Sequence, residues 1–339
     1  MNGLRPGRGR AGAGALVVIA AIAIAQALSQ GSSITAVYAR PSLPTLSYGV
    51  PYAAHAPKAP PASSWVVYPP DSGSNVVPVG KASVQVPILM YHYIRPLPDP
   101  SLDRLGHNLS VSPGDFTAQM DWLRDNGFNP VTISDLRAYL DGKRALPGRP
   151  VVLTFDDGYL DFYTTAWPIL KQHHFKSVAY IVSGFAQDPR TNYMNAEQVR
   201  EVARAGVEIG SHTVTHADLA RTPPSEVVWQ LTESKRVLEG MIGGPVDDFC
   251  YPAGRFDPSV VQAVRDAGYQ SATTTHDGAT HDLNGRFTWD RVRVEGGEPL
   301  DLFAKSLASH EDGVAAPTID PIRLPRTWPL VYVGPLAPS

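Results

Sequence analysis

Apolar and polar positions follow a repeating order through the middle of the chain, in which a short apolar run precedes a segment with helical spacing. Apolar runs of strand length, each bounded by turn residues, predict short buried strands. These runs are residues 84–92, 151–155, 177–182, 207–210, 249–251 and 271–274. Their length and number predict a large sheet.

Helical segments fill most of the gaps between these strands. Ser112 followed by Pro113 is typical of a helix start, and Phe116 and Met120 then fall on one face before Gly127 ends the segment. Further helices are predicted at residues 166–174, 195–205, 224–241 and 257–268. Alternation of strands and helices favours a parallel α/β fold with the helices outside, although periodicity alone does not decide whether the sheet closes into a barrel.

Both ends of the chain differ in composition from this middle part. Residues 1–30 contain three arginines and then an apolar stretch, which is typical of a signal peptide or an uncleaved membrane anchor. Residues 31–83 contain nine prolines and only four charged side chains, which predicts an extended linker. Residues 311–339 contain six prolines and predict an extended tail. We therefore expect one folded domain over residues 84–310, secreted or held at the cell membrane outside the cytoplasm.

Charge and cysteine content narrow the possible partners. The 339 residues include 29 Lys and Arg against 32 Asp and Glu, for a net charge of -3, so that no basic footprint for nucleic acid is present. The single cysteine, Cys250, excludes an internal disulfide and is interpreted as a buried strand residue without a nucleophilic role. The composition does not indicate an oligomeric state.

Two adjacent carboxylates follow one of the predicted strands. The run at 151–155 ends in Asp156, Asp157 and Gly158. Like charges this close raise each other's pKa values unless a cation lies between them, which favours a metal site. The alternative is an ordinary turn in which an aspartate caps the following helix.

Two histidines follow another predicted strand, at 207–210. His212 and His216 are four residues apart, so that a helical turn would bring their ring nitrogens to one ion, although surface histidines with this spacing are common. Two imidazoles and one carboxylate leave positions on a metal open for water and a substrate oxygen. The second carboxylate is then available as a base.

A tight loop follows the strand at 249–251. Pro252 and Gly254 shape this loop, whose backbone N–H groups could face an oxyanion, although Pro-x-Gly alone is also an ordinary turn.

In this order and spacing, the three elements resemble the polysaccharide deacetylase superfamily, carbohydrate esterase family 4. Residues 154–158 match its first motif, Thr-Phe-Asp-Asp-Gly, in full, and residues 212–216 match its second, His-Ser/Thr-x-x-His. The resemblance extends over residues 84–305 and implies a distorted (β/α)7-type barrel with a single catalytic domain.

The resemblance also implies a role for each site residue. Asp156 is expected to be the general base. Asp157, His212 and His216 are expected to bind a divalent metal ion, most commonly zinc but cobalt, nickel or iron in some members. The backbone N–H of Ala253 falls where the family places an oxyanion donor.

The third family motif, Arg-x-Pro-x-Gly, is incomplete in this chain. Cys250 stands where the family has the arginine that orients the base, and Arg255 is a candidate for a nearby positive charge. Residues 289–294 are the nearest counterpart to the fourth motif. The opening segment, residues 87–93, resembles the exopolysaccharide branch that acts on poly-N-acetylglucosamine and lacks parts of the later motifs.

The histidine that would serve as catalytic acid has no clear counterpart. His92, at the end of the first strand, is a candidate for the pocket, with a structural histidine as the alternative. His276 and His281 are the candidates for the acid, with a solvated loop as the alternative. A weak acid function is the expected consequence.

Together these predictions describe a metal-dependent hydrolase that removes N-acetyl groups from an N-acetylglucosamine-containing polysaccharide. The polysaccharide is the expected partner, with no nucleic acid and with a single membrane anchor as a possibility. Two alternatives stay open: an O-acetyl esterase acting on xylan or other glycans, and a weakly active carbohydrate-binding protein of the same fold.

Overall fold

The computed structural model describes residues 82–188 and 192–310 of the chain. The predictions for residues 1–30, for the linker before residue 82 and for the tail at 311–339 lie outside these residues and stay predictions. No helix in the described part of the chain combines the length and the apolar content needed to cross a bilayer.

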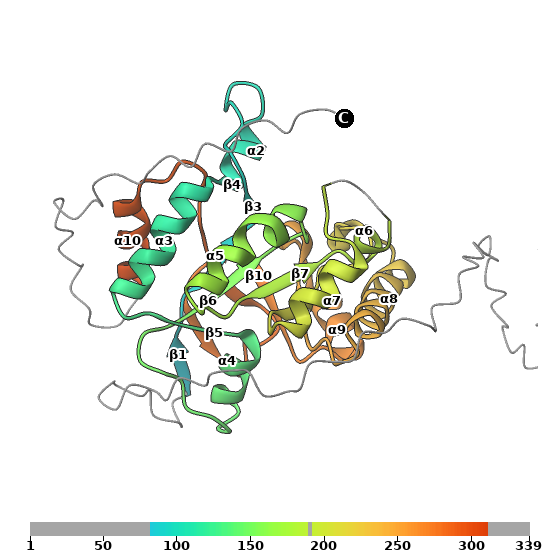
Figure 1. The fold of residues 1–339 in the computed structure, drawn as a ribbon. Coiled ribbons are helices and arrows are strands. Elements are labelled where there is room, and N and C mark those ends of the chain that lie inside the picture. The colour runs from blue at the N-terminus through green and yellow to red at the C-terminus, as the bar shows by residue number, and fades with distance from the viewer. Residues whose placement is uncertain (1–81, 189–191, 311–339) are drawn as a thin grey trace, which may run out of the picture. The chain divides into compact units, whose positions relative to one another are not determined.

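Seven parallel strands close into a barrel (Figure 1), which confirms the predicted distorted (β/α)7-type fold. In order around the barrel they are β2 (Ile88–Tyr91), β6 (Pro150–Phe155), β7 (Val178–Ile181), β8 (Glu208–Ser211), β9 (Asp248–Cys250), β10 (Ser271–Asp277) and β12 (Trp289–Arg293). The ring closes where β12 pairs with β2, with Val292 opposite Leu89. A further strand, β5 (Asn129–Val131), pairs with the first half of β6.

Each predicted apolar run contains a strand, although the run at 84–92 is divided between two strands of different sheets, and β5 and β12 are additions. The sequence of β12 carries charged residues at Asp290, Arg291 and Arg293, which concealed the strand. Outside the barrel, β1 (Ser83–Gln85) pairs antiparallel with β11 (Thr280–Asp282), and β3 (Tyr93–Ile94) pairs with β4 (Ser110–Val111).

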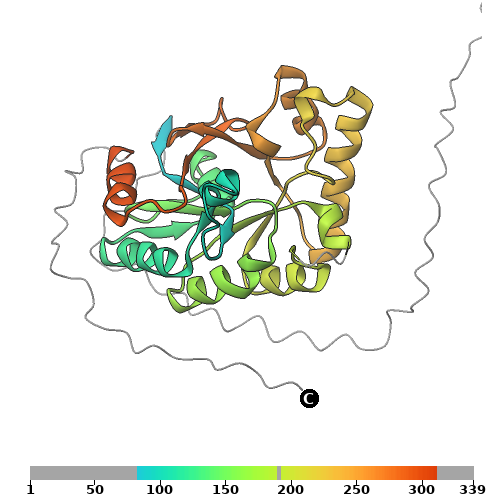
Figure 2. The same cartoon turned by 90° about the horizontal axis from the view of Figure 1, so that it is seen from above.

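Helices surround the barrel, as the view from above in Figure 2 shows. The longer ones are α3 (Pro113–Asp125), α4 (Ile133–Leu140), α7 (Ala196–Arg204), α8 (Pro224–Ile242), α9 (Pro258–Asp266) and α10 (Leu300–Ser309). Between β6 and β7 the π-helix η1 (Phe162–Ala166) continues into α5 (Trp167–Gln172). The predicted cap of α3 is confirmed, because Ser112 Oγ accepts the Asp115 N–H at 3.1 Å.

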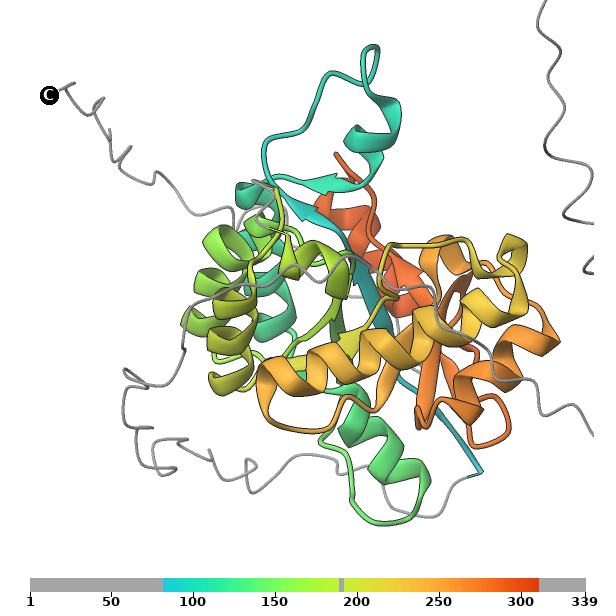
Figure 3. The ribbon, with the colours of Figure 1, turned by 90° about the vertical axis from the view of Figure 1, so that its right-hand side faces the viewer.

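Two short helices lie at the edges of this arrangement. The helix α6 (Ser183–Gln187) follows β7 directly. The helix α2 (Arg104–Asn108) lies in the segment between β3 and β4, which projects from the described domain in both Figure 1 and Figure 3.

The strand period decides which side chains enter the barrel. In β6, Leu153 and Phe155 belong to the apolar layer under the helices, whereas Val152 packs with the residues of the barrel interior. Successive strand residues point to opposite faces, so that Thr154 and then Asp156 continue the inward row. The first of the paired carboxylates is therefore directed into the barrel mouth.

Candidate metal centre and catalytic site

The paired aspartates take different places because the chain turns sharply between them. Asp156 is 3% exposed and continues the inward face of β6. Asp157 has a φ of 71°, a left-handed conformation that few non-glycine residues adopt, and the positive φ continues at Gly158. This turn directs the Asp157 carboxylate toward the loop that follows β8.

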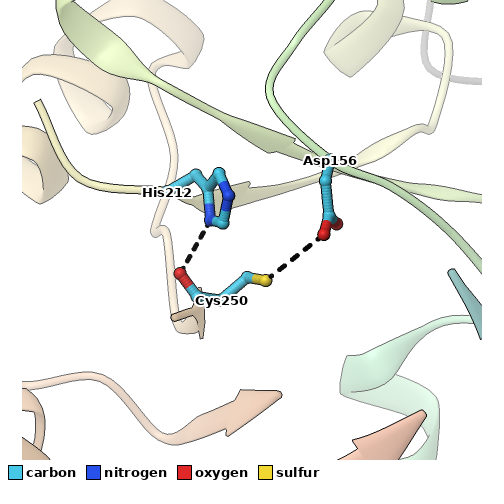
Figure 4. Close-up of side chains that lie close together, drawn as sticks. All are labelled: Asp156, His212 and Cys250. Carbon is cyan, nitrogen blue, oxygen red and sulfur yellow. Dashed lines mark hydrogen bonds between the residues drawn. The ribbon is translucent and has the colours of Figure 1, made fainter. Parts of the chain in front are cut away.

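Asp157, His212 and His216 come together as the sequence predicted. Asp157 Oδ1 lies 3.3 Å from His212 Nε2 and 3.2 Å from His216 Nε2. His212 Nδ1 lies 2.7 Å from the carbonyl oxygen of Cys250 (Figure 4), so that a proton on Nδ1 leaves Nε2 free to bind an ion. The three side chains offer one oxygen and two nitrogens within 4.8 Å of one another.

The loop that carries the histidines is strained and firmly held. Thr213 has a φ of 67° and His216 a φ of 60°. The buried side chain of Gln230, on the long helix α8 in Figure 3, accepts the backbone N–H groups of Val214 and Thr215 at 2.9 and 3.1 Å. Strained backbone that is held by its surroundings is typical of functional sites.

The donor set fits a cation on its own chemistry. Asp157 Oδ1 is buried and makes no hydrogen bond of acceptable geometry to any described residue. Burial opposes the ionisation of Asp157, but the two histidines hold the pKa of its carboxyl well below the usual range. Burial likewise opposes a charge on His212, yet neighbouring groups that include Asp157 raise the pKa of its imidazole well above the usual value. The lowered pKa keeps Asp157 ionised, and the raised pKa of His212 shows that the surroundings of this imidazole favour a positive charge.

Asp156 is held by an arginine, Arg291 of β12, which the sequence interpretation did not assign to it. Arg291 donates from Nη1 to Asp156 Oδ1 at 2.8 Å and from Nη2 to Oδ2 at 2.7 Å. The guanidinium is fully buried. Burial raises the pKa of Asp156, but the adjacent charge of Arg291 outweighs it and lowers the pKa to about 2. Asp156 is therefore an ionised, oriented carboxylate near neutral pH.

The orienting guanidinium is therefore present, but Arg291 supplies it and not Arg255, the candidate from the sequence. The family's position for it holds Cys250, whose Sγ lies 3.2 Å from Arg291 Nη2 and 3.7 Å from Asp156 Oδ2 (Figure 4). Arg255, the candidate from the sequence, instead donates to Asp218 at 2.7 Å and is half exposed. A charged residue on the inward face of a buried strand was the signal that could have identified Arg291.

The structure separates His92, the candidate for the pocket, from His276 and His281, the two candidates for the acid. His92 Nε2 lies 3.8 Å from Asp156 Oδ2, and the side chain is mostly buried. His276 is 63% exposed and lies 3.8 Å from Asp290. His281 is buried, with Nε2 at 2.9 Å from the Val86 carbonyl oxygen, and burial lowers its pKa to about 4. Only His92 of these three adjoins the catalytic carboxylate.

The loop after β9 has the sharp backbone expected of an oxyanion loop. Ala253 is exposed and has a φ of 52°, within the short helical turn η3 (Pro252–Gly254). Gly254, with a φ of 66°, lies so close to β10 that a Cβ atom there would fall 1.9 Å from Thr275 Oγ1. The loop is thus packed tightly against the strand beside it.

Comparison with known proteins gives the same family as the motifs. Residues 143–272 match the family model described as polysaccharide deacetylase. The chain is 32% identical over 225 residues to YxkH of Bacillus subtilis, a candidate polysaccharide deacetylase, covering 66% of this chain and 77% of that protein. It is 39% identical over 119 residues to a poly-beta-1,6-N-acetyl-D-glucosamine N-deacetylase of Escherichia coli, covering 31% of this chain but only 18% of that protein.

Solved structures share the fold. The Streptococcus pyogenes deacetylase PplD, in complex with acetate, superposes with a TM-score of 0.61 at 26% identity, covering 66% of this chain and 98% of that one. IcaB from Ammonifex degensii superposes with a TM-score of 0.57 at 25% identity, covering 67% and 97% of the two chains. The chain therefore belongs to the polysaccharide deacetylase family of hydrolases.

Proposed function

We propose that the chain removes N-acetyl groups from an N-acetylglucosamine-containing polysaccharide, using a divalent metal ion held by Asp157, His212 and His216. The observation that carries the proposal is the meeting of these donors beside the Asp156–Arg291 pair. The motif match and the named activity of the Escherichia coli and Staphylococcus aureus relatives support the substrate class. Imidazole and carboxylate donors suit zinc, and they also accept cobalt, nickel or iron.

The residues divide the work of amide hydrolysis between them. A bound divalent ion would act as a Lewis acid toward the acetyl carbonyl and would lower the pKa of water. Asp156, ionised and held by Arg291, takes a proton from the attacking water. The backbone N–H of Ala253 donates to the developing oxyanion, a contribution of roughly 3–4 kcal/mol per donor in other hydrolases.

We assign the catalytic acid to His92. An amine is a poor leaving group and must gain a proton as the C–N bond breaks. His92 directly follows β2, and its Nε2 lies 3.8 Å from Asp156 Oδ2, so that it lies beside the reacting groups. His276 and His281 are directed to other partners.

The variant His92→Gln is expected to lose about 100-fold or more in kcat on an N-acetylated oligosaccharide, because general acid catalysis is worth about 10²–10⁴-fold. Hydrolysis of 4-nitrophenyl acetate should fall by less than about tenfold, because a nitrophenolate leaves without a proton. The ratio of the two rates is the measurement. His173→Gln, at the end of the outer helix α5 where His173 contacts Asp121, is the matched control and should leave the ratio unchanged. An equal loss on both substrates would contradict the assignment.

Acetate release by the metal-loaded chain tests the proposed function itself. The substrates are N-acetylglucosamine oligosaccharides with β-1,6 or β-1,4 links and an O-acetylated xylo-oligosaccharide. We expect release from an N-acetylated substrate at a higher kcat/KM than from the O-acetylated one. Faster release from the xylo-oligosaccharide would favour the O-acetyl esterase, and no release from any substrate would leave a carbohydrate-binding protein.

A further inference from the structure

A cavity lies beside the catalytic loop, on the side of the barrel formed by β10, β11 and β12. Its volume is about 420 Å³, which is within the range of small-molecule sites. Phe256, His276, Thr280, Asp282 and Asp290 are among the residues that line it. None of these side chains has a role in the hydrolysis proposed above.

The cavity adjoins the catalytic site through two stretches of chain. Phe256 is three residues beyond Ala253, so that their Cα atoms are at most about 11 Å apart. Asp290 immediately precedes Arg291 on β12, and the strand alternation directs Asp290 away from the barrel interior that Arg291 enters. The cavity is thus on the outer face of β12, and a polymer bound at the barrel mouth would reach it by passing over the loop that carries Ala253 and Phe256.

The aromatic part of the lining suits the apolar face of a sugar ring. Phe256 is partly buried, with its ring centroid 4.7 Å from that of Tyr251 and 5.7 Å from that of His276. These contacts hold the ring in place beside the cavity. Rings fixed in this way offer contact area at little cost in conformational entropy.

The polar part of the lining is acidic. Asp282 Oδ1 accepts the Gly285 N–H at 2.7 Å, which fixes the carboxylate at the cavity wall. Asp290 is 39% exposed, and Gly278 makes room for it, since a Cβ atom there would fall 2.9 Å from Asp290 Oδ2. No lysine or arginine is among the described residues that line the cavity. The wall thus offers two carboxylates to a ligand.

We propose that this cavity is a subsite for a deacetylated, positively charged glucosamine unit of the polymer. This inference rests on the proposed function, which produces such units. The carboxylates of Asp282 and Asp290 would bind the ammonium group of this unit. The hydroxyl of Thr280 would bind a sugar hydroxyl, and Phe256 would pack against the sugar ring. An N-acetylated unit carries no charge at this position and therefore binds the carboxylates more weakly. The subsite therefore favours polymer that has already been partly deacetylated.

Binding of two tetrasaccharides to the metal-loaded full chain tests the subsite. One is made of glucosamine and the other of N-acetylglucosamine, and isothermal titration measures both affinities for wild type and Asp282→Asn. The asparagine keeps the acceptor for the Gly285 N–H but removes the charge. We expect Asp282→Asn to weaken binding of the glucosamine tetrasaccharide by about fivefold or more, and that of the acetylated one by less than about twofold.

Asp266→Asn is the matched control, because it removes one acidic charge from α9, away from this cavity. If Asp282→Asn and Asp266→Asn weakened binding of the glucosamine tetrasaccharide equally, net charge alone would explain the effect, and the subsite would be overturned. An unchanged affinity in Asp282→Asn would overturn it as well. Phe256→Ala should weaken both tetrasaccharides. Acetate release from acetylated tetrasaccharide separates the two proposals. Normal release without charge-dependent binding overturns only the subsite, and no release from the wild type overturns the proposed function.

Discussion

Asp157→Ala is expected to abolish metal binding and acetate release together. The substitution removes the oxygen donor that lies between His212 and His216, and it leaves two imidazoles that bind a divalent ion far more weakly. We expect the wild type to retain about one zinc, cobalt, nickel or iron ion per chain after dialysis. The variant should retain little metal and lose about 10⁴-fold or more in kcat/KM. Elemental analysis and an acetate assay on the same samples measure both quantities.

Asp156→Asn is the matched control for this experiment, because it changes the neighbouring carboxylate. It should keep the metal and lose about 10²–10⁴-fold in kcat, as expected for a general base. The pair of variants separates binding of the ion from transfer of the proton. If Asp157→Ala kept both its metal and its rate, the assignment of the whole site would be wrong.

The fold and the donor set could be predicted because both depend on short-range patterns. Apolar runs such as residues 151–155 show where strands end, and in a parallel barrel those ends converge on one face. That is why Asp157 meets His212 and His216, although they lie on loops after different strands. Closure of the barrel was implied by the family resemblance and not by periodicity. It depends on the pairing of β12 with β2, which joins residues far apart in the sequence.

Arg291, which holds the proposed base Asp156, could not be predicted from such short-range patterns. Arg291 reaches Asp156 across 135 positions of the sequence, and its strand is interrupted by charged residues. The small side chain of Cys250 occupies the position of the family's arginine and lies against the guanidinium of Arg291. The positive charge is therefore kept near the base, but a different strand supplies it. A motif that is read one segment at a time does not show such an exchange.

The sequence could not identify the catalytic acid, for a related reason. His276 and His281 are alike in the sequence, since each precedes an aspartate, and His92 follows the first strand without such a neighbour. Only burial and direction distinguish them. The barrel places His92 against Asp156, whereas β11 pairs with β1 and carries His281 to the Val86 carbonyl. Long-range strand pairing, which single-sequence periodicity does not specify, decides between them.

Arg291→Met is expected to lower the free energy of unfolding and to shift the pH dependence of kcat/KM. The variant leaves Asp156 buried without its counter-charge, and loss of one partner of a buried pair typically costs about 3–5 kcal/mol. Asp156→Asn in the same chain should restore part of this loss, because the unpaired charge is then absent. Urea unfolding of the metal-free single and double variants at pH 7 measures the coupling.

The sign of the pH effect follows from the two opposing influences on Asp156. In the wild type, Arg291 lowers the pKa of Asp156 to about 2, below the value of about 3.9 in an unfolded chain. The pair's contribution to stability is thus complete above pH ~4 and is lost as the pH falls toward ~2. In Arg291→Met burial acts unopposed by the guanidinium, so that the pKa rises and the acid limb of kcat/KM moves to higher pH.

Two further variants decide whether Arg291 positions the base or only fills space. Arg291→Lys keeps a charge but loses the bidentate contact, so that it should recover most of the pH shift while kcat stays below the wild-type value. Arg255→Met removes an exposed arginine paired with Asp218 and should change stability by less than about 1 kcal/mol, with no shift of the acid limb. A wild-type pH profile in Arg291→Met would show that the arginine does not set the ionisation of Asp156. If Arg291→Lys restored the acid limb but not the full kcat, Arg291 would make two separable contributions. Its charge would set the ionisation of Asp156, and its bidentate contact would orient the carboxylate.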